Sequence, residues 1–447
     1  MGRAIRSRLW QPSLDSRAPR TLLGAFSIGA PRPAGGTIDR LTSPTVTRYA
    51  GAVSFAPDNR VTYIGRTNHR NSDRLFGIRQ SDRRMHALVI GKTGTGKTHL
   101  LRLILTQDIQ AGAGFAVFDP HGDMARDIRD VASQARGTDV VYIEPVDSAS
   151  PWRFNPFAGV GPESRSLAAT GIVEVFKKLW TDDWGPRLEH LLRNVAFALL
   201  ETEGATFGHI PQLLTDRTYR LELARGLTNQ TVVDFWCHEF DAYTPAFRST
   251  VIAPLQNKVG ALLTDPILRR FLTEEGQLLD LRGIMDKGKL LILNLDKGRL
   301  GESSSSILGS LILSQIGLAS LSRTSVPENE RRDFAVVLDE FQSFTTLSLA
   351  SMLSELRKFR VAICAATQYL SAVQPPIRDA VLGNVGTLIS FRVGAADAAD
   401  LAKELGEPVT ANDLTGLARY NIFLRLLIDG EPSRAFSATV PGMIGSE

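Results

Sequence analysis

The chain has 447 residues, of which 43 % are hydrophobic and 22 % are charged, and its formal net charge is +4. This length suits one large α/β core with an insertion, or two to three ordinary domains. No apolar run approaches the roughly 18 residues that cross a bilayer, so an integral membrane protein is not expected. Two cysteines, Cys237 and Cys364, are too few for a disulfide framework or a zinc site, and a reducing cytoplasm is expected.

Positive charge is concentrated near the N-terminus. Residues 1–84 contain 15 Arg, no Lys and 5 Asp, a balance of +10, which leaves −6 for residues 85–447. Residues 1–50 are rich in Arg, Pro, Gly, Ser and Thr, and we expect them to form a flexible arm. Such an arm can contact nucleic acid or anionic lipid, and its start also resembles a transit peptide. A solvated basic tail is the favoured interpretation.

A glycine-rich segment at residues 91–98 is the most informative feature of the sequence. It matches the phosphate-binding loop G-x-x-x-x-G-K-[ST] at every fixed position. The glycines let successive backbone N–H groups turn toward one anion. An apolar run at residues 87–90 predicts a buried strand before the loop, and an apolar helical face at residues 100–109 follows it. This order directs a helix N-terminus at phosphate, so the chain is predicted to bind a nucleoside triphosphate.

The residues of this loop have separate predicted roles. Lys97 would reach the β- and γ-phosphates, and the Thr98 hydroxyl would hold Mg²⁺. The nucleotide-binding residues predicted from the sequence are Gly91, Lys92, Thr93, Gly94, Thr95, Gly96, Lys97, Thr98 and His99. ATP and Mg²⁺ are therefore the expected cofactors.

Strands and helices alternate around the loop. A hairpin is predicted at residues 53–64, turning at 57–59, and a helix at 124–135 lies between predicted strands at 115–118 and 140–143. Further strands are predicted at residues 290–294, 334–340, 361–366, 387–391 and 420–427, the last two being the final strands, with helices at 304–322 and 346–358. This alternation predicts a mostly parallel sheet with helices on both faces.

Residues 162–285 differ, because they carry long helical patterns and no convincing strand. One helix is predicted at residues 187–200, and another at 248–263 with an interruption near Pro254. We therefore predict four segments. They are the arm (1–50), the first part of the α/β domain with an N-terminal β segment (51–160), an all-α insertion (161–285) and the second part of the α/β domain (286–447).

Acidic and amide side chains follow the predicted strands. Asp339, at a strand end, is assigned to Mg²⁺, and Glu340 to orienting or deprotonating the attacking water. An acidic strand exit can be an ordinary turn, but a phosphate loop in the same sheet favours the catalytic interpretation. Gln368 follows another buried strand and would bond the γ-phosphate or the water. Asp119, His121 and Asp123 would belong to the same site rather than to an independent metal site.

Basic residues end the helix predicted before residue 361. Positive charge at a helix C-terminus commonly compensates the helix dipole. Alternatively, Arg357 is an arginine finger for the nucleotide of a neighbouring subunit, a role that can be worth about 10³–10⁵ in turnover. The residues alone leave both interpretations open.

Several motifs occur together between residues 75 and 437. They are residues 76–78, 82–86, 90–98, 118–123, 338–344, 354–360, 366–370 and 379–387. In combination they resemble the type IV secretion coupling-protein family of the FtsK–HerA superfamily. The resemblance implies a RecA-like P-loop NTPase domain with an all-α insertion, which assembles as a hexameric ring and pumps DNA through its pore using ATP in conjugative transfer or a related mobile-element process.

The resemblance also implies site residues and partners. It assigns Gln368 to a nucleotide sensor and Arg357 to the finger supplied in trans, and it suggests that Arg83 or Arg84 faces the nucleotide of the neighbouring subunit. DNA, identical subunits, and relaxosome or secretion-channel proteins are the implied partners. Membrane-bound members carry N-terminal transmembrane helices that we do not find here. A bacterial cytoplasmic location is expected, with peripheral association at the inner membrane left open.

Two other functions remain as alternatives. One is an ATPase that energises type IV protein secretion or pilus assembly without threading DNA. The other is a nucleotide-regulated adaptor, in which ATP binding sets assembly and hydrolysis is incidental. A metabolic small-molecule kinase is least favoured, because it gives no evident use to the helical insertion and the basic arm.

Overall fold

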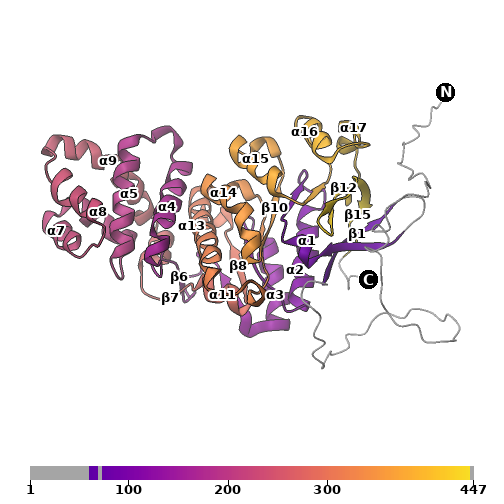
Figure 1. The fold of residues 1–447 in the computed structure, drawn as a ribbon, viewed down its shortest axis with the longest axis horizontal. Coiled ribbons are helices and arrows are strands. Elements are labelled where there is room, and N and C mark those ends of the chain that lie inside the picture. Colours follow the sequence, from indigo (N-terminus) through magenta and orange to yellow (C-terminus); the bar gives the residue numbers. More distant parts are fainter. Residues whose placement is uncertain (1–59, 69–72, 443–447) are drawn as a thin grey trace.

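The computed structural model describes residues 60–68 and 73–442, and these are built around one sheet of 11 strands (Figure 1). In spatial order the strands are β2 (Leu75–Arg79), β1 (Val61–Thr67), β15 (Phe436–Thr439), β12 (Asn421–Arg425), β11 (Thr387–Ser390), β3 (Ala87–Ile90), β10 (Val361–Thr367), β9 (Phe334–Leu338), β4 (Gly114–Asp119), β8 (Leu290–Asn294) and β5 (Val140–Ile143). From β11 to β5 every pair is parallel, whereas the pairs from β2 to β11 are antiparallel.

The parallel part of the sheet is covered by helices on both faces. One face packs on α2 (Lys97–Gln110) and α3 (Asp123–Arg136), and the other on α13 (Glu302–Leu321), α14 (Leu347–Leu356) and α15 (Pro375–Asn384). Strands β4, β8, β9 and β10 are buried at every residue, as strands enclosed on both sides must be. The predicted α/β fold with a mostly parallel sheet is confirmed.

Seven of the remaining helices form a helical layer at the end of the molecule that lies on the left in Figure 1, beyond α13 and α14. They are α4 (Arg165–Leu179), α5 (Pro186–Glu201), α6 (Ile210–Thr215), α7 (Arg217–Arg225), α8 (Gln230–Asp234), α9 (Pro245–Thr264) and α10 (Pro266–Thr273). The two-residue strands β6 (Trp152–Arg153) and β7 (Gln277–Leu278) pair at the base of this layer. The residue boundaries of the segments stay predictions.

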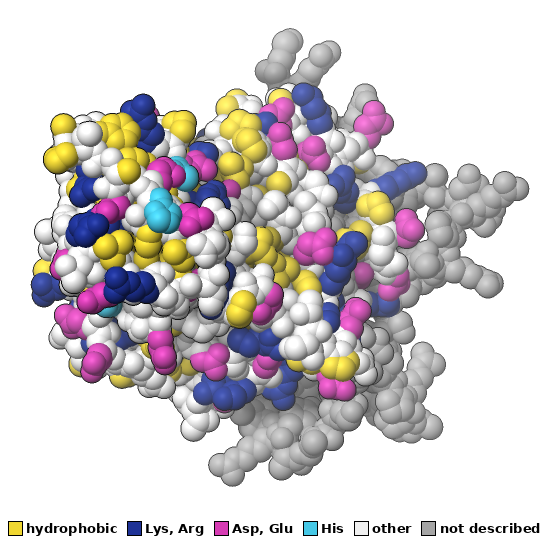
Figure 2. Space-filling model, turned by 60° about the vertical axis from the view of Figure 1, so that its left-hand side comes forward, with side chains coloured by type: hydrophobic (Ala, Val, Ile, Leu, Met, Phe, Trp, Pro, Cys, Tyr) yellow, Lys and Arg dark blue, Asp and Glu magenta, His cyan; other side chains and the backbone are white. Residues whose placement is uncertain are grey.

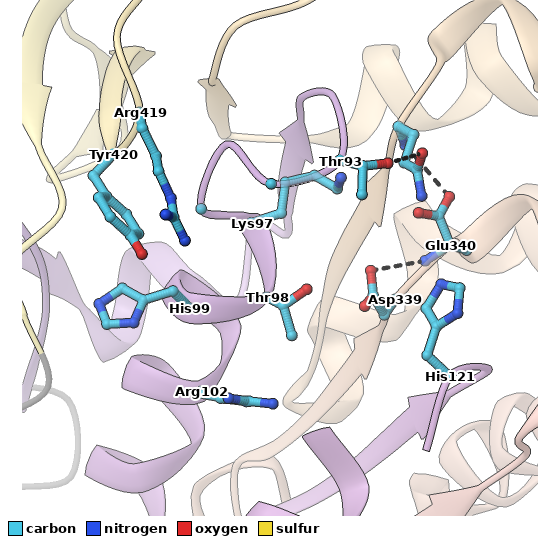
Figure 3. A pocket seen from close by; sticks show the side chains of 13 residues that line it. Thr93, Lys97, Thr98, His99, Arg102, His121, Asp339, Glu340, Arg419 and Tyr420 are labelled. Carbon is cyan, nitrogen blue, oxygen red and sulfur yellow. Dashed lines mark hydrogen bonds between the residues drawn. The ribbon is translucent and has the colours of Figure 1, made fainter. Parts of the chain in front are cut away.

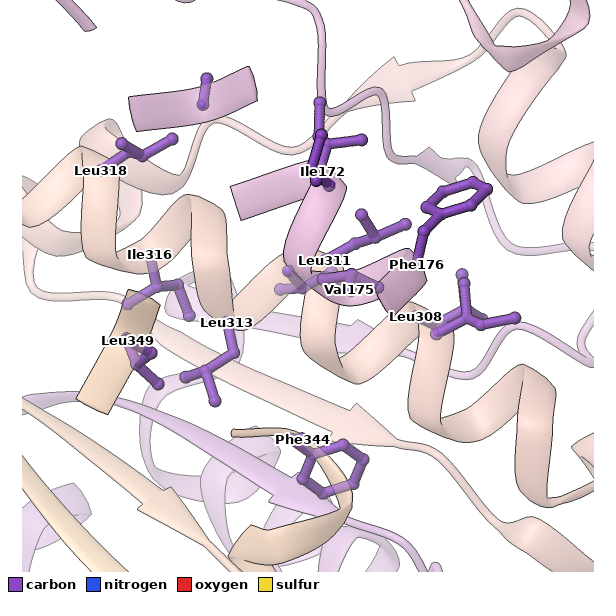
Figure 4. Packing of buried hydrophobic residues seen from close by; sticks show 14 of the residues in the cluster. Ile172, Val175, Phe176, Leu308, Leu311, Leu313, Ile316, Leu318, Phe344 and Leu349 are labelled. Carbon is purple, nitrogen blue, oxygen red and sulfur yellow. The ribbon is translucent and has the colours of Figure 1, made fainter. Parts of the chain in front are cut away.

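Helix α4 joins this helical layer to the rest of the core. Its apolar side chains Ile172, Val175 and Phe176 pack on α13, which in turn contacts Phe344 and Leu349 on the sheet side (Figure 4). The segment Glu302–Ser325, which contains α13, is long and apolar enough to cross a membrane, since a stretch of 18 residues within it has a mean hydropathy of 1.4. However, 72 % of that 18-residue stretch is buried inside the protein, as expected for a central core helix.

The remaining α-helices and strands of the described residues are α1 (Gln80–Arg83), α11 (Leu281–Lys287), α12 (Lys297–Leu300), α16 (Ala395–Leu405), α17 (Ala411–Thr415), β13 (Leu427–Ile428) and β14 (Glu431–Pro432). A 3-10 turn, Arg357–Phe359, follows α14 directly.

Two local predictions differ from the structure. A third, the hairpin at residues 53–64, lies largely outside the described residues; within them, β1 pairs antiparallel with β2. Helix α9 runs without interruption through Pro254, since buried Val251, Leu255 and Val259 hold it against its neighbours on both sides of the proline. Residues 420–427 do not end the sheet, because β15 follows and inserts between β1 and β12.

Candidate nucleotide-binding site

The strand order brings three separate chain segments together at the carboxyl edge of the sheet. The phosphate loop follows β3, Gln368 follows β10, and Asp339 and Glu340 follow β9. Strand β10 lies between β3 and β9, and all three run in the same direction. Gln368 must therefore lie between the phosphate loop and Glu340, at the edge where ligands of open α/β sheets bind.

A pocket of about 300 Å³ opens at this edge (Figure 3). It is lined by Thr93, Gly94, Gly96, Lys97, Thr98, His99, Arg102, His121, Asp339, Glu340, Gln368, Arg419 and Tyr420. Residues predicted from four separate parts of the sequence thus line one cavity, whereas Asp119 does not line it and instead accepts from the backbone N–H groups of His121 and Ala125. Of the predicted loop residues, Gly91, Lys92 and Thr95 do not line the pocket; Gly91 and Thr95 are buried, and Lys92 is exposed.

The loop has the backbone conformation that its glycines permit. Gly94 and Gly96 have φ angles of +75° and +123°, which side chains rarely allow. Thr95 Oγ1 donates to the Lys92 carbonyl at 2.7 Å and closes the turn. Helix α2 then begins at Lys97, and no side chain caps its N-terminus. Its first N–H groups are therefore available to an anion in the pocket.

Lys97 is held over the loop rather than in solvent. Its side chain is buried, and its Nζ donates to the Gly91 carbonyl at 2.5 Å. Burial lowers the pKa of Lys97, while the nearby carboxylates of Glu340 and Asp339 act in the opposite direction. A phosphate group in the pocket would give this cation a stronger acceptor than a carbonyl.

Hydrogen bonds connect the phosphate loop to Glu340 through Gln368 (Figure 3). Thr93 Oγ1 donates to Gln368 Oε1 at 2.6 Å, and the Gln368 backbone N–H donates to Glu340 Oε2 at 3.4 Å. Gln342 Nε2 donates to the same carboxylate oxygen at 2.8 Å. Glu340 has a left-handed backbone with φ +49°, which is costly for a residue other than glycine and turns its side chain toward the pocket.

Asp339 and Thr98 suit a magnesium ion. The pKa of Asp339 is raised to about 6 by burial and by the neighbouring carboxylates of Glu340 and Asp119. A cation would offset this excess of negative charge. Among the described residues no group of three or more His, Cys, Asp or Glu could hold a metal ion alone. Mg²⁺ needs no such cage, because it keeps waters and binds one or two carboxylates together with substrate phosphates.

Arg357 lies at the opposite edge of the sheet. It precedes β10 while Gln368 follows it, and its Nη1 lies 3.5 Å from Met85 Sδ, just before β3. A seven-residue strand spans roughly 20 Å, so exposed Arg357 cannot reach the nucleotide site of its own chain. Arg83 and Arg84 are already engaged inside the chain, in ion pairs with Asp108 and Asp333.

Three residues of the pocket were not predicted from the sequence. Arg102 lies one turn along α2 from Thr98 and could have been placed from helix periodicity. Arg419 and Tyr420 precede β12, more than 300 residues from the phosphate loop, and no motif marks them. Only the strand order brings them to this site.

Comparison with known proteins agrees with this geometry. Residues 76–413 match the family described as the type IV secretion-system coupling protein DNA-binding domain. The plasmid coupling protein TrwB in complex with the GTP analogue GDPNP has a TM-score of 0.61 at 18 % identity, covering 86 % of this chain and 90 % of that one. For VirB4 of Thermoanaerobacter pseudethanolicus the TM-score is 0.57 at 14 % identity, with 86 % and 97 % covered.

These two likenesses show a shared fold, whereas the family match rests on the sequence itself. It covers well over half of the chain, and it contains the phosphate loop, Asp339 with Glu340, and Gln368. The chain belongs to the type IV secretion-system coupling protein family.

Proposed function

We propose that this protein is an ATPase that moves DNA through a ring of identical subunits, in conjugative transfer or a related mobile-element process. The observation that carries the proposal is the chain of contacts from Thr93 through Gln368 to Glu340, which joins a phosphate loop to a candidate general base in one pocket. Nucleotide binding alone gives no use to a carboxylate in this position, whereas hydrolysis can use it to activate water.

Each side chain would have a defined part in hydrolysis. Lys97 and the N–H groups of the loop would bind the β- and γ-phosphates, and bound Mg²⁺, held by Thr98 and Asp339, would neutralise charge on them. Glu340 would accept a proton from the water that attacks the γ-phosphorus. Gln368, fixed between Thr93 and Glu340, would position that water and respond to loss of the γ-phosphate.

Related structures support the choice of nucleotide. TrwB has been described in complex with the ATP analogue ADPNP, with a TM-score of 0.57 at 18 % identity, and with ADP and Mg²⁺, with a TM-score of 0.60 at 17 % identity. The residues that would hold the same groups here are Lys97, Thr98 and Asp339. We therefore propose ATP and Mg²⁺ for this site.

The choice of DNA as the cargo rests on the family description, which names DNA binding. On the face of the helical layer seen in Figure 2, basic and acidic side chains are interspersed rather than gathered by sign. That face does not have the character of a broad phosphate-binding surface. A channel enclosed by a ring, with relaxosome or secretion-channel proteins outside it, is the arrangement that we propose.

The first experiment measures steady-state ATP hydrolysis by the full chain with and without DNA. Stimulation by DNA, abolished in Lys97→Ala, is the expected result. On duplex DNA, log K for binding should fall with log salt at about −0.9 for each phosphate neutralised. Hydrolysis that ignores DNA and responds to a protein partner would instead favour the protein-secretion ATPase. Partner recruitment that survives complete loss of hydrolysis would favour the adaptor.

The position of Arg357 requires a test of its role across subunits. We propose that it completes the nucleotide site of a neighbour, since it lies far from the site of its own chain. Arg357→Ala should bind ATP normally and hydrolyse it about 10³-fold more slowly or worse. When the Arg357→Ala and Lys97→Ala proteins are mixed, part of the ATP hydrolysis should return. The reason is that some sites would then combine the intact phosphate loop of an Arg357→Ala subunit with the intact Arg357 of a Lys97→Ala subunit. Lys358→Ala, one residue away and also exposed, is the matched control.

A further inference from the structure

Two residues next to β12 form the wall of the pocket that faces away from the carboxylates. Figure 3 shows Arg419 and Tyr420 on one side of Lys97, and Asp339 and Glu340 on the other. The proposed hydrolysis gives no role to Arg419 or Tyr420. Its composition, an aromatic ring and a cation, also differs from the polar surface at the opposite end of the pocket.

The backbone of Tyr420 is fixed to the phosphate loop. Its N–H donates to the Thr95 carbonyl at 2.9 Å, and its own carbonyl accepts from the Val440 N–H at 2.9 Å. It holds a left-handed conformation with φ +64°, which is an unfavourable state for a bulky side chain. The loop and β15 together therefore hold this turn in a conformation that the residue would not adopt alone, and such outliers cluster at ligand sites.

The Tyr420 ring is packed directly on the loop. A Cβ added to Gly96 would lie 2.8 Å from Tyr420 Cδ1, so the glycine leaves room for the ring. The ring of His99 meets it edge to face, with 5.3 Å between the ring centroids, and His99 Nε2 is 2.8 Å from the Pro441 carbonyl oxygen. The ring is therefore held in place before any ligand arrives.

Arg419 places a cation on the same ring. Its guanidinium carbon lies 4.7 Å from the centre of the Tyr420 ring. Within residues 60–68 and 73–442, neither a carboxylate nor any hydrogen-bond acceptor pairs with this exposed guanidinium. A stacked arginine with no anion of its own can cover the face of a nucleotide base or approach a phosphate.

We infer that Arg419, Tyr420 and His99 form the nucleoside subsite of this pocket, the part that receives the base and ribose. The inference rests on the proposed nucleotide-binding function. The phosphates, bound at Lys97 and Thr98 beside the carboxylates, leave the rest of the nucleotide to extend along the opposite wall. Stacking on aromatic rings and on guanidinium groups is the general way in which proteins hold a base without reading its edge.

The test compares Mg-ATP with Mg-tripolyphosphate, which has the phosphates but no nucleoside, in calorimetric titrations of the full chain. Tyr420→Asn removes the ring while asparagine tolerates the left-handed backbone, and it should weaken ATP binding about tenfold. Arg419→Gln should weaken it about threefold. Tripolyphosphate affinity should stay within about twofold in both variants, which also shows that the loop is folded.

Two controls complete the design. Tyr420→Phe keeps the ring and should bind ATP as the wild type does, and Tyr63→Asn removes an exposed tyrosine from β1 and should have no effect. Equal weakening of ATP and tripolyphosphate, or no weakening of either, would overturn the inference. A Lys97→Ala variant with unchanged ATP affinity would instead refute the nucleotide function itself.

Discussion

A buried charge cluster links the phosphate-loop helix to the N-terminal strands, and it gives a sharp test of the structure. Asp108 on α2 has a side chain that is 1 % exposed, and both its oxygens accept from Arg83, at 2.7 and 2.9 Å. Arg60 Nη2 also donates to it, at 2.7 Å. Burial alone would raise the pKa of Asp108, but the two guanidinium groups outweigh it and lower the pKa.

The substitution Asp108→Asn keeps the shape of the side chain but removes its charge. Arg83, with 9 % of its side chain exposed, would then be a buried cation facing an amide. Breaking a buried pair in this way costs about 3–5 kcal/mol, because the remaining charge is left uncompensated. Loss of a hydrogen bond alone would cost only about 0.5–1.5 kcal/mol.

A second ion pair, between Arg102 on α2 and Asp127 on α3, provides the control. Arg102 and Asp127 are also 2.7 Å apart, but the Asp127 side chain is 55 % exposed. Asp127→Asn should therefore cost about 0–1 kcal/mol, the range of exposed pairs. The two substitutions are chemically identical, but Asp108 is buried between two arginines whereas Asp127 is exposed and pairs with one. The comparison therefore tests burial together with the number of cations left without a carboxylate.

Urea unfolding of the full chain gives the free energy of unfolding from the midpoint and slope of the transition. Asp108→Asn should be less stable than Asp127→Asn by at least about 2 kcal/mol. Adding Arg83→Met to Asp108→Asn should restore part of the loss, because the uncompensated charge is removed. Equal costs for the two aspartates, or a further loss in the double variant, would refute the reasoning.

Three further predictions test the active site and the core. Glu340→Gln should lower turnover by about 10²–10⁴ with ATP affinity unchanged, as measured by single-turnover hydrolysis and calorimetry. Gly309→Ala should lower the free energy of unfolding in urea by about 1–3 kcal/mol, since the added Cβ would lie 2.2 Å from Phe344 Cδ1. Gly317→Ala on the same helix should be nearly neutral, because its Cβ would lie 3.2 Å from the sulfur of a flexible methionine. Burial lowers the pKa of His86, so as the pH falls through about 6.5 the unfolded chain binds a proton before the folded chain does. The free energy of unfolding should therefore decrease below that pH, as measured by the urea midpoint. This dependence of the midpoint on pH should vanish in His86→Asn.

Sequence patterns predicted the buried part of the sheet well, for a physical reason. Strands β3, β4, β8, β9 and β10 are enclosed by helices on both faces, so each is a run of apolar residues and glycine, apart from the last residue of β4, β8 and β10 (Asp119, Asn294 and Thr367). A continuous apolar run between turn residues is visible in any sequence. Gln368 could be placed at the ligand edge for the same reason, because it directly follows such a run.

The antiparallel strands were harder to predict. Strand β15 has four residues, of which one is buried, so neither an apolar run nor a clear alternation marks it. The register of β1 against β2 is also irregular between Tyr63 and Gly65. Since strand order cannot be read from such short segments, no sequence argument could bring Arg419 and Tyr420 to a loop more than 300 residues away.

Each of the two walls of the pocket contains a residue with a left-handed backbone that hydrogen bonds hold in place. Glu340 and Tyr420 both hold left-handed backbones, with φ angles of +49° and +64°, and each lies beside the end of a strand. Hydrogen bonds tie Glu340 to Gln368, and Tyr420 to the Thr95 carbonyl. Each such residue costs roughly 1–3 kcal/mol, which the surrounding sheet must supply. We therefore expect the antiparallel strands β12 and β15 to be part of the candidate nucleotide site, because they hold one wall of the pocket in a conformation that the phosphate loop could not impose alone.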